Sequence, residues 1–335
     1  MFKSFLQSTF LDSLNAPYYI NISVIGVGLA TNLISIVIFT RKKLNSNTNI
    51  GKMHSILCFL NMLPLLNSII LIQILPSTTG LNLITYTSFS CKLVSFWLRL
   101  ALTLPSAQQV LITFMLFVSV RSPLQYIKMR KNTNKILLVT YISIFLINFQ
   151  YFFYELEPIS KSEPNSSSNS SEYECTGSDF SAISLDMAGL GVRFVVPLLI
   201  MTGMNLLIFY QVYQSKKMFC SVKKRGIKIF LTSIVIVNFM FLVFYLPWAV
   251  MMVLNYYFYF NLNTNSYLNF FYSAHNYFNY AKSISYLNNS ITFFVHIVFN
   301  KLFKSEIASI VKNFWQTVKI KPAPTSASNL IQAKS

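Results

Sequence analysis

Long apolar stretches recur seven times along the sequence, and polar segments separate them. The hydrocarbon core of a bilayer is about 30 Å thick, and a helix of roughly 20 apolar residues crosses it. Because lipid offers no hydrogen bonds to exposed backbone groups, each stretch is predicted to be a helix. The pattern therefore predicts an all-α membrane protein built as a seven-transmembrane helix bundle. The predicted spans are residues 18–40, 53–75, 92–118, 136–155, 187–213, 227–254 and 273–299.

A shorter amphipathic stretch follows the last span. Its apolar residues, among them Phe303, Ile307 and Val311, alternate with Lys301 and Lys304. This pattern is typical of a helix that lies on a membrane surface. We predict an N-terminal segment at 1–17, a seven-transmembrane domain at 18–299, a short amphipathic eighth helix at 300–316 and a disordered tail at 317–335.

The composition argues against a soluble protein. Of the 335 residues, 54% are hydrophobic and 11% are charged, whereas soluble domains carry about 25% charged residues. A soluble bundle of deeply buried helices is the alternative, but seven such segments leave too few residues for a hydrated surface. The N-terminus has no signal-peptide pattern, so the first span is expected to act as the targeting signal.

Charge is distributed asymmetrically among the predicted loops. The segments after the first, third and fifth spans, together with the tail and with Lys228 at the start of the sixth span, hold 21 of the 27 Lys and Arg residues and a single acid, Glu306. Loops rich in Lys and Arg remain in the cytoplasm. We therefore predict a multi-pass protein of the plasma membrane, with an extracellular N-terminus and a cytoplasmic C-terminus. The asymmetry explains the net charge of +18 without a nucleic-acid partner.

Two cysteines and two glycosylation sequons fall on the predicted extracellular side. Cys91 opens the third span, and Cys175 lies in the long acidic loop after the fourth. Disulfides persist on the oxidising side of a membrane, and Cys91–Cys175 is the one pairing that this topology allows there. Two free thiols are the alternative. The same loop carries sequons at Asn165 and Asn169, which are acceptors for N-glycosylation on this face.

Short motifs occur in or directly after five of the spans. The first span holds Gly28 and Asn32 in GLATN, and Pro123-Leu-Gln-Tyr126 begins 32 residues after Cys91, beyond the third span. The fifth span holds Pro197, the sixth Phe241-Leu-Val-Phe-Tyr245-Leu-Pro247, and the seventh Tyr286-Leu-Asn288-Asn289-Ser290, which is followed by Phe303-Lys304. In this order, over about residues 18–315, the chain resembles the rhodopsin-like family of G-protein-coupled receptors, with Tyr245 in place of the family's Trp. The resemblance implies a receptor that binds an extracellular ligand and signals through a heterotrimeric G protein.

The inner ends of the spans depart from the family pattern. The Asp-Arg-Tyr triplet of the third span reads Met115-Leu116-Phe117, and the sodium-site Asp of the second span corresponds to Asn61 or, in another alignment, to Leu60. In the family, the triplet's Arg contacts the G protein and locks the resting state. Leu116 has no charge, so the resemblance implies weak or constitutive coupling.

The sixth and seventh spans also carry candidate switch residues. Pro247 removes a backbone hydrogen bond and predicts a kink, which is a hinge for outward movement of the inner end of the sixth span. In the seventh span the Asn-Pro-x-x-Tyr motif ends in His296, which we expect to be a buried packing residue. Phe293 in place of its Pro resembles some invertebrate neuropeptide receptors of the FMRFamide type.

Three cations lie deep inside the predicted spans, away from their ends, namely Arg99, Arg193 and Lys282. Ionisable residues within a membrane are costly and usually functional. The resemblance implies that these levels line the ligand cavity, together with Tyr245. One interpretation is a site for an anionic ligand group. The other is that the cations pair with Asp186, backbone carbonyls or lipid phosphate, or extend to the interface.

The sequence thus favours a receptor over other classes. The third span has no acid for a ligand ammonium, so a peptide or another ligand with an anionic group is expected. A receptor-like protein without G-protein coupling and, less favoured, a transporter are the alternatives. No catalytic arrangement, cofactor motif or metal-ligand spacing is apparent in the sequence, and no enzyme activity is expected.

The predicted topology is tested by glycosylation and by tag access. Glycosidase treatment should shift the mass of the membrane-expressed protein, and substituting Asn165 and Asn169 together with Gln should abolish that shift. An epitope tag after Ser335 should bind antibody only after permeabilisation. Labelling of that tag on intact cells would reverse the predicted orientation.

Overall fold

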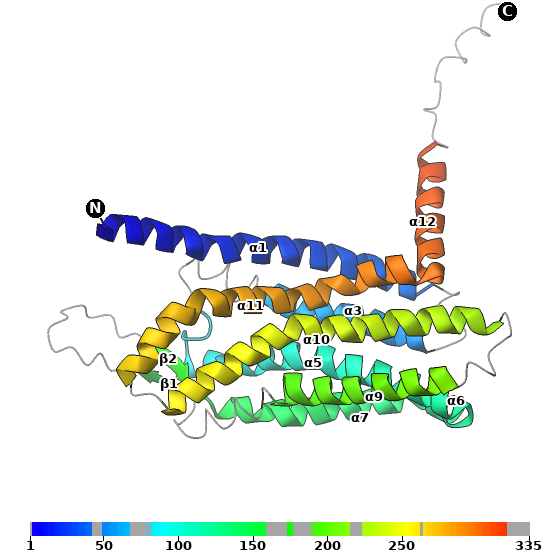
Figure 1. The fold of residues 1–335 in the computed structure, drawn as a ribbon, viewed down its shortest axis with the longest axis horizontal. Helices are drawn as coiled ribbons and strands as arrows, with labels where there is room; N and C mark the ends of the chain where they lie inside the picture. Colours follow the sequence, from blue (N-terminus) through cyan, green and yellow to red (C-terminus); the bar gives the residue numbers. More distant parts are fainter. Residues whose placement is uncertain are drawn as a thin grey trace, which may run out of the picture.

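The computed structural model describes residues 2–41, 49–67, 79, 82–158, 173–176, 189, 191–214, 223–261 and 264–319. Helices dominate these residues (Figure 1). Their bounds are α1 Phe2–Phe39, α3 Ile50–Asn67, α5 Ser88–Arg121, α6 Pro123–Lys131, α7 Thr133–Asn148, α9 Val196–Gln214, α10 Lys223–Asn261, α11 Thr264–Phe299 and α12 Lys301–Lys319.

Shorter elements extend two of these helices and form a small sheet. A 3-10 helix over Phe149–Phe153 continues α7, and a π-helical turn over Gly191–Val195 leads into α9. The strands β1, Glu155–Pro158, and β2, Tyr173–Thr176, pair antiparallel. The expectation of a purely helical protein missed this sheet, because the strands are four residues long and lie in a polar loop.

Five of the described helical segments are long and apolar enough to cross a membrane: Ile20–Phe39, Ser88–Arg121, Thr133–Phe153, Gly191–Gln211 and Ile234–Asn255. They correspond to five of the seven predicted spans. For the predicted span 53–75, the described helix ends at Asn67. For 273–299, α11 is long, but its many Asn, Ser and Tyr residues lower its hydropathy.

Several predicted boundaries differ from the structure. The helix α1 begins at Phe2, so the predicted segment 1–17 is not separate from the first helix. Likewise, α12 ends at Lys319, inside the predicted tail, of which residues 320–335 lie outside the described part. Both differences have the same cause: hydropathy marks where a helix would enter lipid, while a helix continues as long as its backbone hydrogen bonds do.

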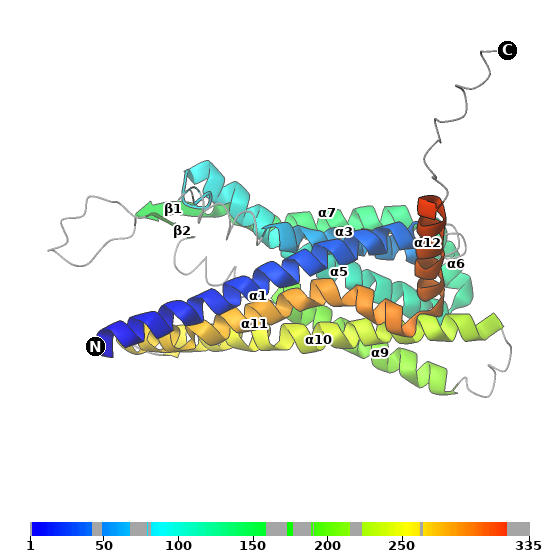
Figure 2. The ribbon, with the colours of Figure 1, turned by 90° about the horizontal axis from the view of Figure 1, so that it is seen from above.

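The long helices lie side by side, with different elements at the two ends of the assembly (Figures 1 and 2). The β-hairpin and the N-terminus lie at one end, which we call the hairpin end. The helices α6 and α12 lie at the other, which we call the α12 end, and α12 turns across the direction of the long helices. The central element is α5, which packs against α3, α7 and α9 and also contacts α10.

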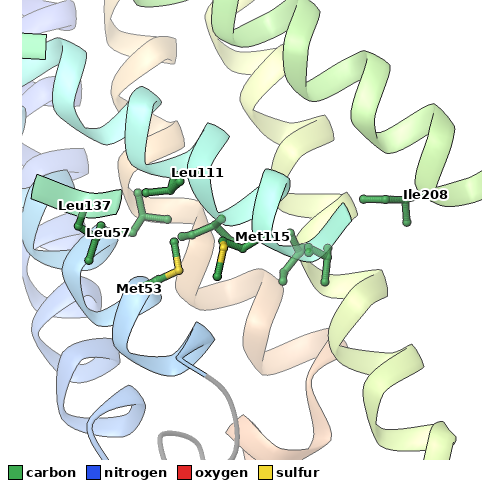
Figure 3. Close-up of a cluster of buried hydrophobic side chains, with 9 residues drawn as sticks. Met53, Leu57, Leu111, Met115, Leu137 and Ile208 are labelled. Carbon is green, nitrogen blue, oxygen red and sulfur yellow. The ribbon is translucent and has the colours of Figure 1, made fainter. Parts of the chain in front are cut away.

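An apolar cluster fills the space between the helices toward the α12 end. Figure 3 shows Met53 and Leu57 from α3 meeting Leu111 and Met115 from α5, with Ile208 reaching in from α9. Each of these side chains is at least nine-tenths buried. Between membrane-spanning helices such side chains stabilise the fold by van der Waals packing, because lipid chains are as apolar as they are. The complete cluster is Met53, Leu57, Leu111, Ile112, Met115, Leu116, Leu137, Ile208 and Ile234.

A second contact group sets the direction of α12. Asn300 caps this helix, since its side-chain oxygen accepts hydrogen bonds from the backbone N–H groups of Leu302 and Phe303 at 3.1 and 3.2 Å. Phe303 is fully buried, with its ring centroid 5.1 Å from that of Phe39 on α1. A salt bridge of 3.3 Å joins Arg41 to the buried Glu306. These contacts hold α12 against the end of α1.

Candidate functional site

The β-hairpin is joined to the first turn of α5 by a disulfide. Cys91 and Cys175 are bonded, with their Cα atoms 5.6 Å apart. Within the hairpin, Cys175 on β2 lies opposite Leu156 on β1. The Oγ of Ser95, one turn further along α5, lies 3.4 Å from the Sγ of Cys175. The predicted bridge is therefore present, and it holds the hairpin over the end of α5.

Two of the three predicted cations meet at one tyrosine below this bridge. The guanidinium of Arg99 on α5 lies over the ring of Tyr151, 5.2 Å from its centroid. The Nη2 of Arg193 donates a hydrogen bond to the Tyr151 hydroxyl at 3.2 Å. Tyr151 is fully buried and belongs to the apolar cluster that contains Cys91. We call Arg99, Tyr151 and Arg193 the arginine pair site.

The chemistry of the arginine pair site follows from its side-chain types. A guanidinium is attracted to the face of an aromatic ring, and its fixed fork of N–H groups holds oxygen acceptors. Both modes occur on Tyr151. The Nε of Arg193 also donates to the backbone carbonyl of Gly189 at 2.9 Å. A Cβ at Gly189 would collide with the Tyr151 hydroxyl and the Arg193 guanidinium, so only glycine allows this approach.

The other predicted ligand residues lie in different surroundings. Tyr245 on α10 is buried, with ring centroids 5.0 Å from Phe194 and 4.5 Å from Phe241. Because Phe194 directly follows Arg193, the π-helical turn connects the arginine pair site to α10. Lys282 is partly buried on α11 and is not among the contacts that define the site. Asp186, Asn165 and Asn169 lie outside the described residues.

The residues predicted to control coupling fall into apolar surroundings at the α12 end. Met115 and Leu116 are buried in the cluster of Figure 3, at 1% and 3% exposure. Phe117 packs against that cluster, and the Arg121 guanidinium lies 5.8 Å from its ring centroid. Met115-Leu116-Phe117 therefore form an apolar contact among helices, followed in the sequence by one arginine.

Asn32, one of the asparagines of the motifs, joins α1 to α11. Asn32 donates through its side-chain amide to the backbone carbonyls of Gly28 and Asn289, each at 2.7 Å. A Cβ at Gly28 would collide with Ser290 and Leu65, so this glycine permits close packing. Asn61 on α3 and Asn288 on α11 are both buried.

His296 and Pro247 lie on the two helices that form the most extensive helix pair. His296 is fully buried, 5.2 Å between ring centroids from both Phe39 and His54. It therefore packs among aromatic rings of α1 and α3. Pro247 lies inside α10, which continues on both sides of it.

Two groups of residues make contacts between helices that the sequence did not lead us to expect. Tyr151 was not identified because nothing in its local sequence, FQYFF, separates it from its aromatic neighbours. The second group is a set of amide and hydroxyl side chains, Gln109, Thr113, Asn205 and Asn238, which connect α5, α9 and α10. Their polar character inside apolar spans was a usable signal, although it does not reveal which of them are partners.

Comparison with known proteins adds no assignment. No protein-family model matches the chain, and no curated protein is detectably similar to it. The likeness to rhodopsin-like receptors therefore rests on the order and spacing of motifs within this sequence.

The disulfide should be needed for a stable protein at the cell surface. Cys91→Ser and Cys175→Ser should each reduce surface expression strongly, because loss of a native disulfide costs about 2–5 kcal/mol. The double variant should be no worse than either single one, since both remove the same bond. Cys58→Ala, at a buried cysteine outside the bridge, is the control and should retain near-normal expression. Additive losses would show that Cys91 and Cys175 act independently.

Proposed function

We propose that this protein is a cell-surface receptor of the rhodopsin-like G-protein-coupled type, with seven membrane spans. Five of the described helical segments have the length and composition of spans, and α3 and α11 pack beside them to complete the proposed set. The observation that carries the proposal is the disulfide that ties the β-hairpin to the head of α5. The hairpin held by this disulfide lies at the same end as the arginine pair site. This arrangement supports ligand binding at the hairpin end.

The distribution of positive charge supports the orientation of this receptor. Helix α6 ends in Lys128, Arg130 and Lys131, and α12 begins with Lys301 and carries further lysines. By the positive-inside rule the α12 end faces the cytoplasm. The hairpin and the N-terminus then face outward at the plasma membrane.

The amphipathic helix α12 fits this orientation. Val311, Phe314 and Trp315 are exposed on it, close in sequence to Lys312. Exposed apolar side chains beside lysines suit the boundary between acyl chains and anionic headgroups. The direction of α12, across the long helices, lets it lie along the membrane surface.

The proposed ligand is a peptide, or another molecule, with an anionic group. Arg99 and Arg193 approach the same buried tyrosine from two helical elements, so two guanidinium groups contact one side chain. A carboxylate can accept two parallel hydrogen bonds from a guanidinium, so these side chains have the chemistry to recognise an anionic group. Asp186, or a lipid phosphate, is the alternative source of negative charge.

The inner end supports weak or constitutive coupling to a heterotrimeric G protein. Burial of Leu116 in an apolar cluster leaves this position without the charge that the family uses to lock its resting state. The same observation favours the second candidate function, a receptor-like protein that binds its ligand without activating a G protein.

Substitution of Arg99 tests the ligand proposal. In cells with a promiscuous G-protein reporter, peptides with a free C-terminal carboxylate should be screened beside their amidated forms, with radioligand displacement as a direct measure of binding. Arg99→Gln should weaken an acidic agonist about 30-fold or more, because losing one partner of a buried charge pair costs about 2–5 kcal/mol and about 1.4 kcal/mol is tenfold. The amidated form should be much less affected.

The matched control for this test is Arg121→Gln. Arg121 lies on the same helix and also contacts an aromatic ring, Phe117, but at the α12 end. Its loss should leave the binding affinity of the acidic peptide unchanged. Equal losses in the two variants, or equal losses for both forms of the peptide, would contradict a carboxylate site at Arg99.

Restoring a charged triplet tests the coupling proposal. Met115→Asp combined with Leu116→Arg should lower basal reporter activity, because the pair can form the family's resting lock. Ile127→Arg, which adds a positive charge at an exposed position of α6, is the control and should leave basal activity as it is. If neither the wild type nor the restored form responds to a ligand that demonstrably binds, the receptor-like protein without coupling becomes the favoured function.

A further inference from the structure

The side-chain amide of Asn238 on α10 is bonded to two other helices. Its Nδ2 donates to the Oγ1 of Thr113 on α5 at 2.8 Å and to the Oδ1 of Asn205 on α9 at 3.0 Å. Its Oδ1 accepts a hydrogen bond from the Nε2 of Gln109 on α5 at 2.9 Å. Asn238 is 3% exposed, so both amide protons and the carbonyl oxygen are satisfied by protein groups in a buried place.

These bonds supply the directional contact between α10 and its neighbours. Helix α10 packs chiefly against α11, and its contacts with α5 and α9 are less extensive. In an apolar interior, a polar side chain that loses its partner remains costly until it finds another. The arrangement of Gln109, Thr113, Asn205 and Asn238 therefore favours one position of α10 relative to α5 and α9.

Asn238 lies at a position along α10 where it can restrain the part of this helix at the α12 end. Asn238 precedes Pro247 by nine residues, which is about 13.5 Å along a helix. Ile234, one turn closer to the α12 end, belongs to the apolar cluster that buries Leu116. The amide contact thus lies between the proline inside α10 and the part of α10 that packs at the α12 end.

We propose that Gln109, Thr113, Asn205 and Asn238 form a neutral amide lock that holds the α12-end half of α10 against α5 and α9 in the resting receptor. The lock opens when α10 swings outward about Pro247. It takes the place of the charged lock that Leu116 cannot form. As a device for receptor activation this rests on the proposed function, whereas the restraint on α10 follows from the hydrogen bonds alone.

A distance measurement across the α12 end tests the lock without relying on G-protein coupling. Spin labels are attached at Lys128→Cys on α6 and Lys223→Cys at the start of α10, in full-length protein with Cys58→Ala and Cys220→Ser. Double electron–electron resonance then gives the ratio of longer to shorter separations. Asn238→Leu, which keeps the branched shape of the side chain but has no polar atoms, should raise this ratio about tenfold, which corresponds to about 1.4 kcal/mol.

The matched control is Gln108→Leu. Gln108 is the neighbour of Gln109 on α5 and is fully buried, but its amide bonds to α3 and α7: it donates to the Met53 carbonyl at 2.9 Å and accepts from the Tyr141 hydroxyl at 2.8 Å. Its loss should lower thermal stability and leave the distance ratio unchanged. If Gln108→Leu and Asn238→Leu shift the ratio equally, the lock is wrong and the amides serve only general packing.

Milder variants keep the test decisive if Asn238→Leu folds poorly. Thr113→Val and Asn205→Leu each remove one partner of Asn238 and should each raise the ratio by a smaller factor. Combining either with Asn238→Leu should add little, because the bond is already lost. An unchanged ratio in both single variants overturns the proposal.

Basal reporter activity measured in parallel separates this proposal from the proposed function. A raised distance ratio together with raised basal activity supports both. A raised ratio with silent signalling supports the lock and counts against G-protein coupling. An unchanged ratio overturns the lock whatever the reporter shows.

Discussion

The arrangement of the helices depends on how α5 satisfies its polar side chains. This helix is predominantly apolar, yet it carries Arg99, Gln108, Gln109 and Thr113 at buried or partly buried positions. In surroundings without water such groups need partners from other elements. They find them on α3, α7 and α10, and in the 3-10 helix that contains Tyr151. Each partnership selects one packing of a neighbouring helix among the many that apolar contact alone would allow.

The two ends of α5 differ in the side chains that surround them. At the hairpin end, a disulfide and a buried tyrosine hold two guanidinium groups close together, which concentrates positive charge where the proposed ligand binds. At the α12 end, Met115 and Leu116 are enclosed by aliphatic side chains of four other helices. Apolar contacts are non-directional, so they resist separation of the helices without specifying a single orientation. The hydrogen bonds of Asn238, located between these regions, favour one orientation of α10.

A neutral lock has different physical behaviour from a charged one. Hydrogen bonds between amides do not depend on the protonation of either partner, and salt screening affects them far less than it affects exposed charges. Interhelical bonds of this kind contribute modestly, on average about 0.6 kcal/mol each in a membrane. Three such bonds favour the proposed resting position by an amount small enough for the proposed ligand to overcome.

Features that depend on residues close together in the chain could be predicted from the sequence. Hydropathy placed the five helical segments that are long and apolar enough to span a membrane, the amphipathic pattern located α12, and the two cysteines on one predicted face implied the Cys91–Cys175 bridge. The tertiary structure alone decided which polar groups meet. Gln109 and Asn238 are 129 residues apart, and Tyr151 and Arg193 are 42 apart. A polar residue in an apolar span shows locally that it needs a partner, but the choice of partner depends on how separate helices pack, which no local pattern records.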